Sequence, residues 1–170
     1  LTLAALKGNT PTVILEHRAL YGVEGNIPIK ALPAEIGQAE ILREGKDITI
    51  VATSLMAQES LKAAEYLASK NISAEVIDPR WIRPLDEKSI LNSVRKTGRL
   101  IAVDVSWELY GFASEVSALA AEKAFEDLKS PVLRISLADT PAPVSHPLEE
   151  VFYPHAQTIV AAVYKSMGLK

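Results

Sequence analysis

Residues 75–86 read Glu75-Val76-Ile77-Asp78-Pro79-Arg80-Trp81-Ile82-Arg83-Pro84-Leu85-Asp86. A short apolar run ends in a charged loop that two prolines interrupt, and this pattern is typical of a junction between a strand and a helix. Asp86 carries a side-chain oxygen that can cap the first turn of the next helix. We therefore expect a strand at 74–77, a loop, and then a helix over 86–96.

Strand-like and helix-like segments alternate on both sides of this junction. Upstream, a β-branched run at 48–52 precedes a helix over 56–70 whose apolar residues share one face. Downstream, we expect strands at 100–103 and 132–135 and helices over 112–127 and 156–167. The alternation predicts βαβ units and therefore an α/β fold of three layers, with a mostly parallel sheet between two layers of helices.

The first part of the chain is less regular. We expect the end of a helix at 1–7, a buried strand at 12–15, a linker rich in Gly and Pro at 22–37, and a short strand at 39–43. Gly45 lies between this strand and the next, which locally predicts a hairpin. Because the sequence opens on Leu1 rather than on methionine, we expect the middle of a longer gene product.

Composition narrows the classes of function. The 170 residues are 48% hydrophobic and 23% charged with a net charge of −3, which is ordinary for a globular domain and predicts neither nucleic acid nor a membrane as a partner. The chain contains no cysteine, which excludes disulfides and thiolate catalysis. No apolar run approaches the roughly 20 residues that span a bilayer.

Ligands of open α/β sheets bind beyond the carboxyl ends of the strands. The charged residues expected at that edge are Asp78, Arg80, Arg83, Asp104, Glu108 and Asp139. They could form a small site for an anion or a carboxylate. The alternative, which we favour because such loops are polar in most folds of this kind, is that they solvate the loops and pair with one another.

Motifs for a complete active site are absent from the sequence. There is no Gly-x-Gly-x-x-Gly, no Walker loop and no Gly-x-Ser-x-Gly, although counting residues leaves a Ser-His-Asp arrangement open. A metal site is not predicted, because His17 (expected at a strand end), His146 and His155 (expected in loops) share no ligand spacing. Among the aromatic residues, Trp81 and Trp107 are expected in loops and are therefore candidate interface residues.

Several segments together resemble a known family. Thr12–Tyr21 resembles the end of the pyrimidine-binding domain of the β subunit of thiamine-diphosphate-dependent 2-oxo acid dehydrogenases, the E1 component of pyruvate and branched-chain complexes. Six further segments resemble the transketolase-like C-terminal domain of that subunit, and they occur in the same order and spacing. They are Ile36–Glu40, Glu44–Thr49, Ile77–Asp86, Lys96–Leu100, Gly111–Glu115 and Asp139–Pro143.

The resemblance implies a division of the chain and a sheet topology. Residues 1–22 would be a remnant of the pyrimidine-binding domain, 23–35 a linker, and 36–170 the transketolase C-terminal-like domain. The family's sheet has five strands, of which the first lies antiparallel to the other four and not beside the second. This topology contradicts the hairpin that Gly45 suggests locally, and we adopt the family's arrangement.

The resemblance also implies a function. The full enzyme decarboxylates a 2-oxo acid and passes the acyl group to lipoyl groups, using thiamine diphosphate and magnesium. The family's catalytic glutamate lies in the pyrimidine-binding domain, and the Gly-Asp-Gly string of the cofactor motif does not occur in this chain. We therefore assign no catalytic, cofactor-binding or metal-binding residue and expect no cofactor on this chain alone.

The expected partners are an E1 α subunit, a second β subunit and the acyltransferase (E2) core. We expect a homodimer with Trp107, Tyr110 and Phe112 near the contact, and Trp81 as a further interface residue. The expected location is the cytoplasm, or the mitochondrial matrix in a eukaryote. The alternatives are the C-terminal section of a transketolase or a deoxyxylulose-phosphate synthase, or a stand-alone doubly wound module that binds a ligand of its own.

Overall fold

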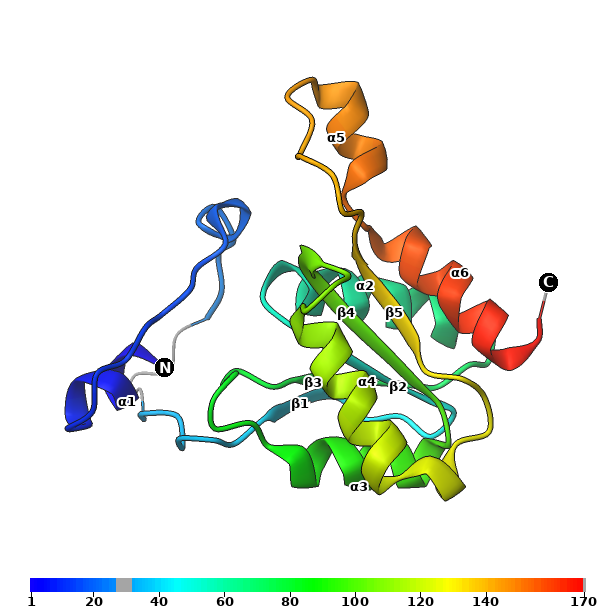
Figure 1. Cartoon of the computed structure of the whole chain (residues 1–170), viewed down its shortest axis with the longest axis horizontal. Helices are drawn as coiled ribbons and strands as arrows, with labels where there is room; N and C mark the ends of the chain where they lie inside the picture. The colour runs from blue at the N-terminus through cyan, green and yellow to red at the C-terminus, as the bar shows by residue number, and fades with distance from the viewer. Residues whose placement is uncertain (27–31, 170) are drawn as a thin grey trace.

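The computed structural model describes residues 1–26 and 32–169 (Figure 1). The strands are β1 (Glu40–Arg43), β2 (Ile48–Ala52), β3 (Ala74–Asp78), β4 (Leu100–Trp107) and β5 (Leu133–Leu137). The α-helices are α1 (Thr2–Lys7), α2 (Leu55–Ala68), α3 (Glu87–Thr97), α4 (Phe112–Lys123), α5 (His146–Phe152) and α6 (Ala156–Met167), with 3-10 helices η1 (Arg18–Leu20) and η2 (Phe125–Asp127).

The five strands form one sheet in the order β1-β3-β2-β4-β5. β2, β3, β4 and β5 are parallel to one another, whereas β1 pairs with β3 in the antiparallel direction. The three-layer fold with one antiparallel strand is thereby confirmed. The hairpin expected around Gly45 is wrong, because β3 lies between β1 and β2.

A close backbone contact explains why the chain passes from β1 to β2 without a hairpin. An added Cβ at Gly45 would lie 2.1 Å from the amide nitrogen of Glu75 in β3, so only glycine fits where the connection crosses that strand. Immediately afterwards, the Asp47 carboxylate accepts a hydrogen bond of 2.7 Å from the amide of Ser73. The connection is therefore attached to the start of β3 rather than folded back on β1.

The sheet buries an apolar layer on each face. β2 is buried along its whole length, as expected for a central parallel strand covered on both sides. Ile50 faces the cluster that α2 and α6 complete, whereas the next residue, Val51, faces the cluster formed with α3 and α4. The alternation of side chains along a strand accounts for this split.

The junction quoted at the start of the sequence analysis folds as expected. The Asp86 carboxylate accepts hydrogen bonds from the amide and the hydroxyl of Ser89, at 3.0 and 2.7 Å, and so caps α3. Helix α3 ends at Gly98, whose φ of 75° is the left-handed conformation that glycine adopts readily. Its apolar residues Ile90, Leu91 and Val94 are buried, which confirms the predicted face.

Other local expectations are wrong. Residues 12–15 form no strand, and Val13 and Leu15 are exposed, because no described strand lies beside them. The expected helix over 112–127 ends at Lys123, and a 3-10 turn replaces its last part. His146 lies in helix α5 rather than in a loop, and Trp107 is the last residue of β4.

Figure 1 shows two parts of the chain outside the three layers. Residues 1–26 lie to one side of the sheet, and α5 projects beyond the carboxyl ends of the strands. Of the helices within residues 1–26 and 32–169, none combines the length and the apolar character needed to cross a membrane.

Candidate assembly surface at the carboxyl edge of the sheet

Asp104 lies within β4, beside the carboxyl end of β2, at the point where the order of the strands reverses. Its carboxylate is buried. One oxygen accepts a 2.8 Å hydrogen bond from the Thr53 hydroxyl, and the other accepts a short one from Ser106. Both oxygens of the best-placed carboxylate at this edge are therefore bonded within the domain.

The charged residues of the β3 loop also bind their own surroundings. The Arg80 guanidinium pairs with Glu40 at the start of β1, and the Asp78 carboxylate accepts a 2.9 Å hydrogen bond from the amide of Arg80. Burial raises the pKa of Asp78, an effect that this hydrogen bond only partly offsets. Asp86 accepts a further bond of 3.0 Å from the amide of Ala39, so the loop fixes the entry of the chain into β1.

These contacts support the expectation that the charged residues stabilise loops rather than hold an anion. Arg83 and Asp139 are exposed at the same edge, and among the described residues their side chains make no hydrogen bond or ion pair. Within that same part of the chain, no group of three or more His, Cys, Asp and Glu is placed to hold a metal ion.

The turn 107–111 follows β4 and directs large apolar side chains outward. Tyr110 is fully exposed, and Trp107 and Leu109 are each more than half exposed. The turn is nevertheless firmly anchored, because Ser114 and Arg134 both donate to the carbonyl of Glu108, at 2.8 and 3.0 Å. Arg134 also pairs with the Glu108 carboxylate at 2.8 Å.

Two backbone features shape this turn. An added Cβ at Gly111 would lie 2.2 Å from the carbonyl oxygen of Trp107, so the turn closes too tightly for any other residue. Tyr110 has a φ of 57°, an uncommon conformation for a bulky residue that carries strain. The turn is therefore a rigid element that holds an aromatic side chain in solvent.

The second apolar element is an arm formed by residues 138–155, which contains α5 and leaves the sheet after β5 (Figure 1). Val144 and Val151 are 97% and 85% exposed, and Leu148 is more than half exposed. The arm returns to the domain at α6, where the Glu59 carboxylate accepts a 2.9 Å hydrogen bond from the amide of Ala156.

The arm carries a shallow groove of about 370 Å³. We call it the arm groove, and its lining is Ala138, Thr140, Pro141, Pro143, Leu148, Val151 and Phe152. None of these side chains is charged. The groove and the turn 107–111 lie at the same edge of the sheet, because both follow the carboxyl ends of parallel neighbouring strands.

The candidate interface residues differ in their surroundings. Trp107 and Tyr110 belong to the exposed turn, as the hypothesis requires. Phe112 packs against the core cluster on the α3 and α4 face, so it serves the fold. Trp81 is half-buried, and its indole N–H is buried without a hydrogen-bond partner among the described residues.

Sequence reasoning missed the arm. The apolar residues Val144, Leu148 and Val151 recur at helical spacing, and Pro147 lies in the first turn, where proline is favoured. This signal was present but short, and the segment is rich in proline, which argued for a loop. Leu109 was missed as well, because one apolar residue between charged and aromatic neighbours has no periodicity.

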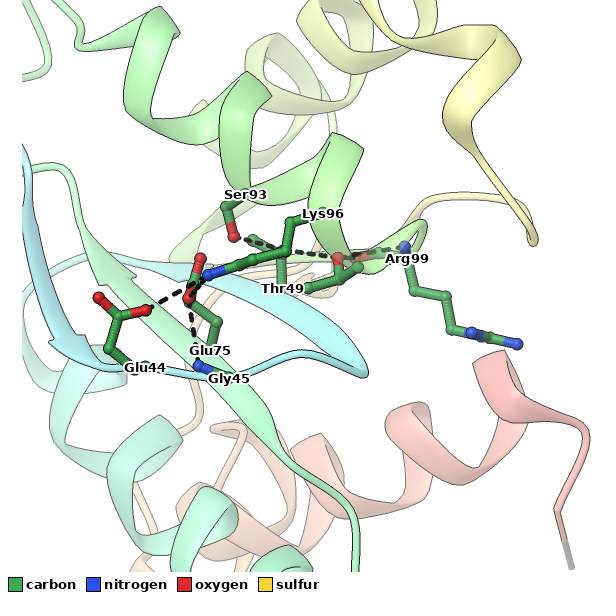
Figure 2. A network of polar contacts seen from close by, with 8 residues as sticks. Glu44, Gly45, Thr49, Glu75, Ser93, Lys96 and Arg99 are labelled. Atoms are coloured by element: carbon green, nitrogen blue, oxygen red, sulfur yellow. Dashed lines mark hydrogen bonds and ion pairs between the residues drawn. The ribbon is translucent and has the colours of Figure 1, made fainter.

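A polar network lies at the opposite part of the sheet, between β1, β3 and α3 (Figure 2). The buried Glu75 carboxylate accepts hydrogen bonds from Lys96 and from the amide of Gly45, the latter at 3.1 Å. Lys96 also pairs with Glu44 at 3.3 Å. Beside them, the Thr49 hydroxyl bonds to Ser93 and Thr97 at 2.7 and 2.8 Å, which fastens α3 to β2.

This network borders an open cavity of about 230 Å³. Burial acts to raise the pKa of Glu75, but the hydrogen bond from Lys96, with smaller contributions from Ser93 and Gly45, outweighs it and lowers that pKa. The same pairing raises the pKa of Lys96. Since every charge here has a partner within the domain, we interpret the network as structural.

The comparison with known families finds an extended match. The family model described as "Transketolase, C-terminal domain" matches residues 37–159. The chain belongs to this family. The matched region of this transketolase C-terminal domain contains the whole sheet and both elements of the exposed edge, and it begins beyond residues 1–26.

Curated relatives of this transketolase C-terminal domain protein include β subunits of two enzymes. It is 40% identical over 167 residues to the acetoin:2,6-dichlorophenolindophenol oxidoreductase subunit beta of Cupriavidus necator, with 98% of this chain and 49% of that protein covered. It is 45% identical over 163 residues to the mitochondrial pyruvate dehydrogenase E1 component subunit beta-1 of Arabidopsis thaliana, with 94% and 45% covered.

A solved structure agrees with this placement. A protein described as "Split gene transketolase, inactive beta4 tetramer" is 30% identical and matches with a TM-score of 0.72, covering 86% of this chain and 48% of that one. The chain thus spans about half the length of the relatives that it matches.

Proposed function

We propose that this chain is the C-terminal part of the β subunit of a thiamine-diphosphate-dependent 2-oxo acid dehydrogenase E1 component, and that it serves subunit assembly and partner docking. The identity to β subunits over nearly the whole chain supports the first statement. The observation that supports the role in assembly and docking is the contrast between charged and apolar side chains at the carboxyl edge of the sheet. There the buried and paired charges are bonded within the domain, while Trp107, Tyr110 and the arm present apolar side chains to solvent.

In this proposal the chemistry lies on other parts of the enzyme. Thiamine diphosphate and magnesium would be held by the α subunit and by a pyrimidine-binding domain of which residues 1–22 are a remnant, with 23–35 as a linker and 36–170 as the C-terminal domain. The partners would be an α subunit, a second β subunit and the acyltransferase core. The compartment would be the bacterial cytoplasm or the mitochondrial matrix.

The substrate has two candidates. A 2-oxo acid such as pyruvate follows from the relatives named pyruvate dehydrogenase, and acetoin follows from the relative of Cupriavidus necator. A transketolase role has less support, because the relatives that cover nearly the whole chain at 40% and 45% identity are named as β subunits of an acetoin oxidoreductase and a pyruvate dehydrogenase, whereas the split-gene transketolase is 30% identical.

The first test is the coding sequence upstream of Leu1. The proposal expects a further domain of about 150 residues that resembles a pyrimidine-binding domain, whereas a stand-alone module requires no such domain. The second test is activity after assembly with the α subunit, measured by dichlorophenolindophenol reduction. Dependence on pyruvate, on a branched-chain 2-oxo acid or on acetoin assigns the substrate, and activity with none of these contradicts the proposal.

The third test uses the 170-residue chain by itself. We expect titration calorimetry to detect no micromolar binding of thiamine diphosphate with magnesium, and we expect no decarboxylation of 2-oxo acids. Replacement of Trp107 by alanine should weaken self-association without changing the circular dichroism spectrum. Tight binding of the cofactor to this chain would show that the division of labour is wrong.

A further inference from the structure

We infer that the edge of the sheet at which the parallel strands begin is a docking surface for a short acidic segment of a partner protein. Five cationic side chains form this surface, which we call the basic row: Lys46, Lys70, Arg99, Lys129 and Lys165. The row lies at the end of the sheet opposite to the turn 107–111 and the arm. The inference therefore goes beyond the proposed function and does not depend on it.

The first part of the row joins the starts of β3, β2 and β4. The amide of Lys46 donates to the carbonyl of Ser73, which directly precedes β3, at 3.1 Å. Lys70 lies three residues before Ser73, just after the end of α2. In β2, the amide of Thr49 donates to the carbonyl of Arg99 at 2.9 Å. These backbone bonds bring three cations from separate segments to one edge.

The second part continues the row to β5 and α6. The amide of Lys129 donates at 2.7 Å to the carbonyl of Gly98, the neighbour of the cation that precedes β4. The hydroxyls of Ser130 and Ser166 are 2.9 Å apart and hydrogen-bonded. This bond brings Lys165, in the last turn of α6, to the same edge. Five segments that are distant in sequence thus each supply one cation.

The charges of the row are not neutralised within the domain. Among residues 1–26 and 32–169, none of the five side chains forms an ion pair with a carboxylate. Lys129 donates instead to the carbonyl of Thr97 at 3.3 Å, and the Lys70 ammonium lies over the ring of Tyr66. The Asp47 carboxylate beside the row is engaged by the amide of Ser73.

Arg99 shows most clearly that the row is separate from the Glu75 network. Its backbone takes part in that network, but its side chain extends away from it (Figure 2). Within the described part of the chain no hydrogen bond holds the guanidinium, and its buried Nε is without a partner. The positive charge of Arg99 is therefore available to a group from outside the domain.

The ordinary role of cations at this edge would be to offset helix dipoles. Helices α2, α3, α4 and α6 all end there, and each helix C-terminus carries about half a negative charge, so the four supply about two. The five full positive charges of the row exceed this amount. The edge therefore remains electropositive, although the chain as a whole carries a net charge of −3.

The length of the row indicates the kind of partner. Neighbouring strands lie about 4.8 Å apart, so the starts of four strands span about 15 Å, which an extended polypeptide covers with about five residues. The net negative charge of the chain opposes nucleic acid and anionic membranes, because these extend well past the row. A short acidic polypeptide segment meets the cations without meeting the remaining surface.

The test titrates a fluorescein-labelled hexaglutamate peptide with the 170-residue chain and follows fluorescence anisotropy. We expect binding that weakens as salt is added, because salt screens exposed charges, and no binding of the matched hexaglutamine peptide. Absence of hexaglutamate binding at low salt would refute the surface. Tighter binding of a single-stranded hexanucleotide, or of vesicles that contain phosphatidylserine, would overturn the choice of an acidic polypeptide.

Two triple variants of equal net charge locate the binding. The first neutralises three cations of the row whose side chains make no hydrogen bond within the described residues: Lys46→Gln, Arg99→Gln and Lys165→Gln. The control neutralises three exposed cations outside the row: Lys7→Gln, Arg83→Gln and Lys88→Gln. Each exposed ion pair contributes a factor of about two to five, so the first variant should raise the dissociation constant about ten-fold or more and the control less than about two-fold. Equal increases would show that binding follows net charge alone and would refute the surface.

A footprint on the native chain provides a test that does not depend on variants. A brief acetylation of lysines, read by mass spectrometry, should modify Lys46, Lys129 and Lys165 less when hexaglutamate is present, and should modify Lys7 and Lys88 equally in both samples. Equal protection of all five would show that the peptide does not select the row and would overturn the inference. None of these outcomes changes the tests of the proposed function, which depend on the coding sequence and the assembled activity.

Discussion

Lys96 of helix α3 and Glu75 of strand β3 form an ion pair in which the Glu75 side chain is buried and the Lys96 side chain remains 43% exposed. Removal of the lysine leaves a buried carboxylate with only the amide of Gly45 and nearby hydroxyls as donors. We expect Lys96→Met to lower the free energy of unfolding by about 1–3 kcal/mol, measured by urea denaturation.

The matched control for this pair is Lys123→Met. Lys123 pairs with Glu87, and both side chains are about half exposed. Because water screens such a pair, the loss of stability should be clearly smaller than that of Lys96→Met. Equal losses of unfolding free energy at the two positions would show that the burial of Glu75 does not strengthen its ion pair with Lys96.

The Glu75 carboxylate should make stability depend on pH in the acid range. Its pKa in the folded protein lies below the ordinary value of 4.5, so its contribution is complete above pH 4.5 and is lost as the pH falls through the folded-state pKa. Thermal unfolding from pH 7 to pH 3 should therefore show a smaller acid loss for Glu75→Gln than for the native chain. Parallel curves would contradict the assignment.

Asp78 should behave in the opposite sense. Burial raises its pKa above the ordinary 3.8, so the ionised form destabilises the folded state at neutral pH, and this penalty disappears once the pH falls below 3.8. We expect Asp78→Asn, which keeps an oxygen for the amide of Arg80, to raise Tm at pH 7 and to lose that gain toward pH 4. Asp139→Asn, an exposed carboxylate at the same edge, should change Tm little at either pH.

Gly111 offers a test of the turn that holds Tyr110. Gly111→Ala forces a Cβ to within 2.2 Å of the Trp107 carbonyl oxygen, and such overpacking costs about 1–3 kcal/mol of stability. Self-association should weaken at the same time, because the turn can no longer keep its shape. Gly25→Ala is the control, since no atom lies within 4 Å of the added Cβ; a similar effect there would remove the steric explanation.

Limited proteolysis should separate the two parts of the chain. Val13 and Leu15 are exposed outside the three layers, whereas β2 is completely buried, and cleavage requires local opening of the backbone. We expect the first cut between Gly22 and Gly37, followed by a resistant fragment that begins near residue 38. A first cut inside 48–135 would contradict the domain boundaries that we propose.

Local sequence patterns predicted those strands and helices whose own residues show a recognisable pattern. The apolar runs of β2, β3 and β4 and the Asp86 cap of α3 need no distant partner to be recognised, and all were confirmed. The placement of β1 depends on the contact of Gly45 with the backbone of Glu75, some 30 residues away in sequence. No local rule contains such a contact, and only the resemblance to the family predicted it.

The remaining errors have the same origin. The run at 12–15 has strand character but no described neighbour to pair with, so an intrinsic preference did not become a strand. Strand β4 was expected to end at residue 103 but extends to Trp107, because its last residue pairs with Leu137 of β5. The exposure of Trp107 and Tyr110 could be suspected from their place between elements, but the arm groove depends on how α5 folds beside residues 138–143, which its short apolar pattern did not reveal.

The antiparallel direction of β1 fixes where the polypeptide before residue 40 is delivered. Because Glu40 lies opposite Asp78, the chain enters the sheet at the edge that carries the exposed turn and the arm, and not at the far edge beside the Glu75 network. A parallel first strand with the same side chains would attach the preceding polypeptide to the other end of the domain. The orientation of one four-residue strand therefore decides which end of the domain the preceding polypeptide joins. It brings that polypeptide to the face with which the domain would meet its partners.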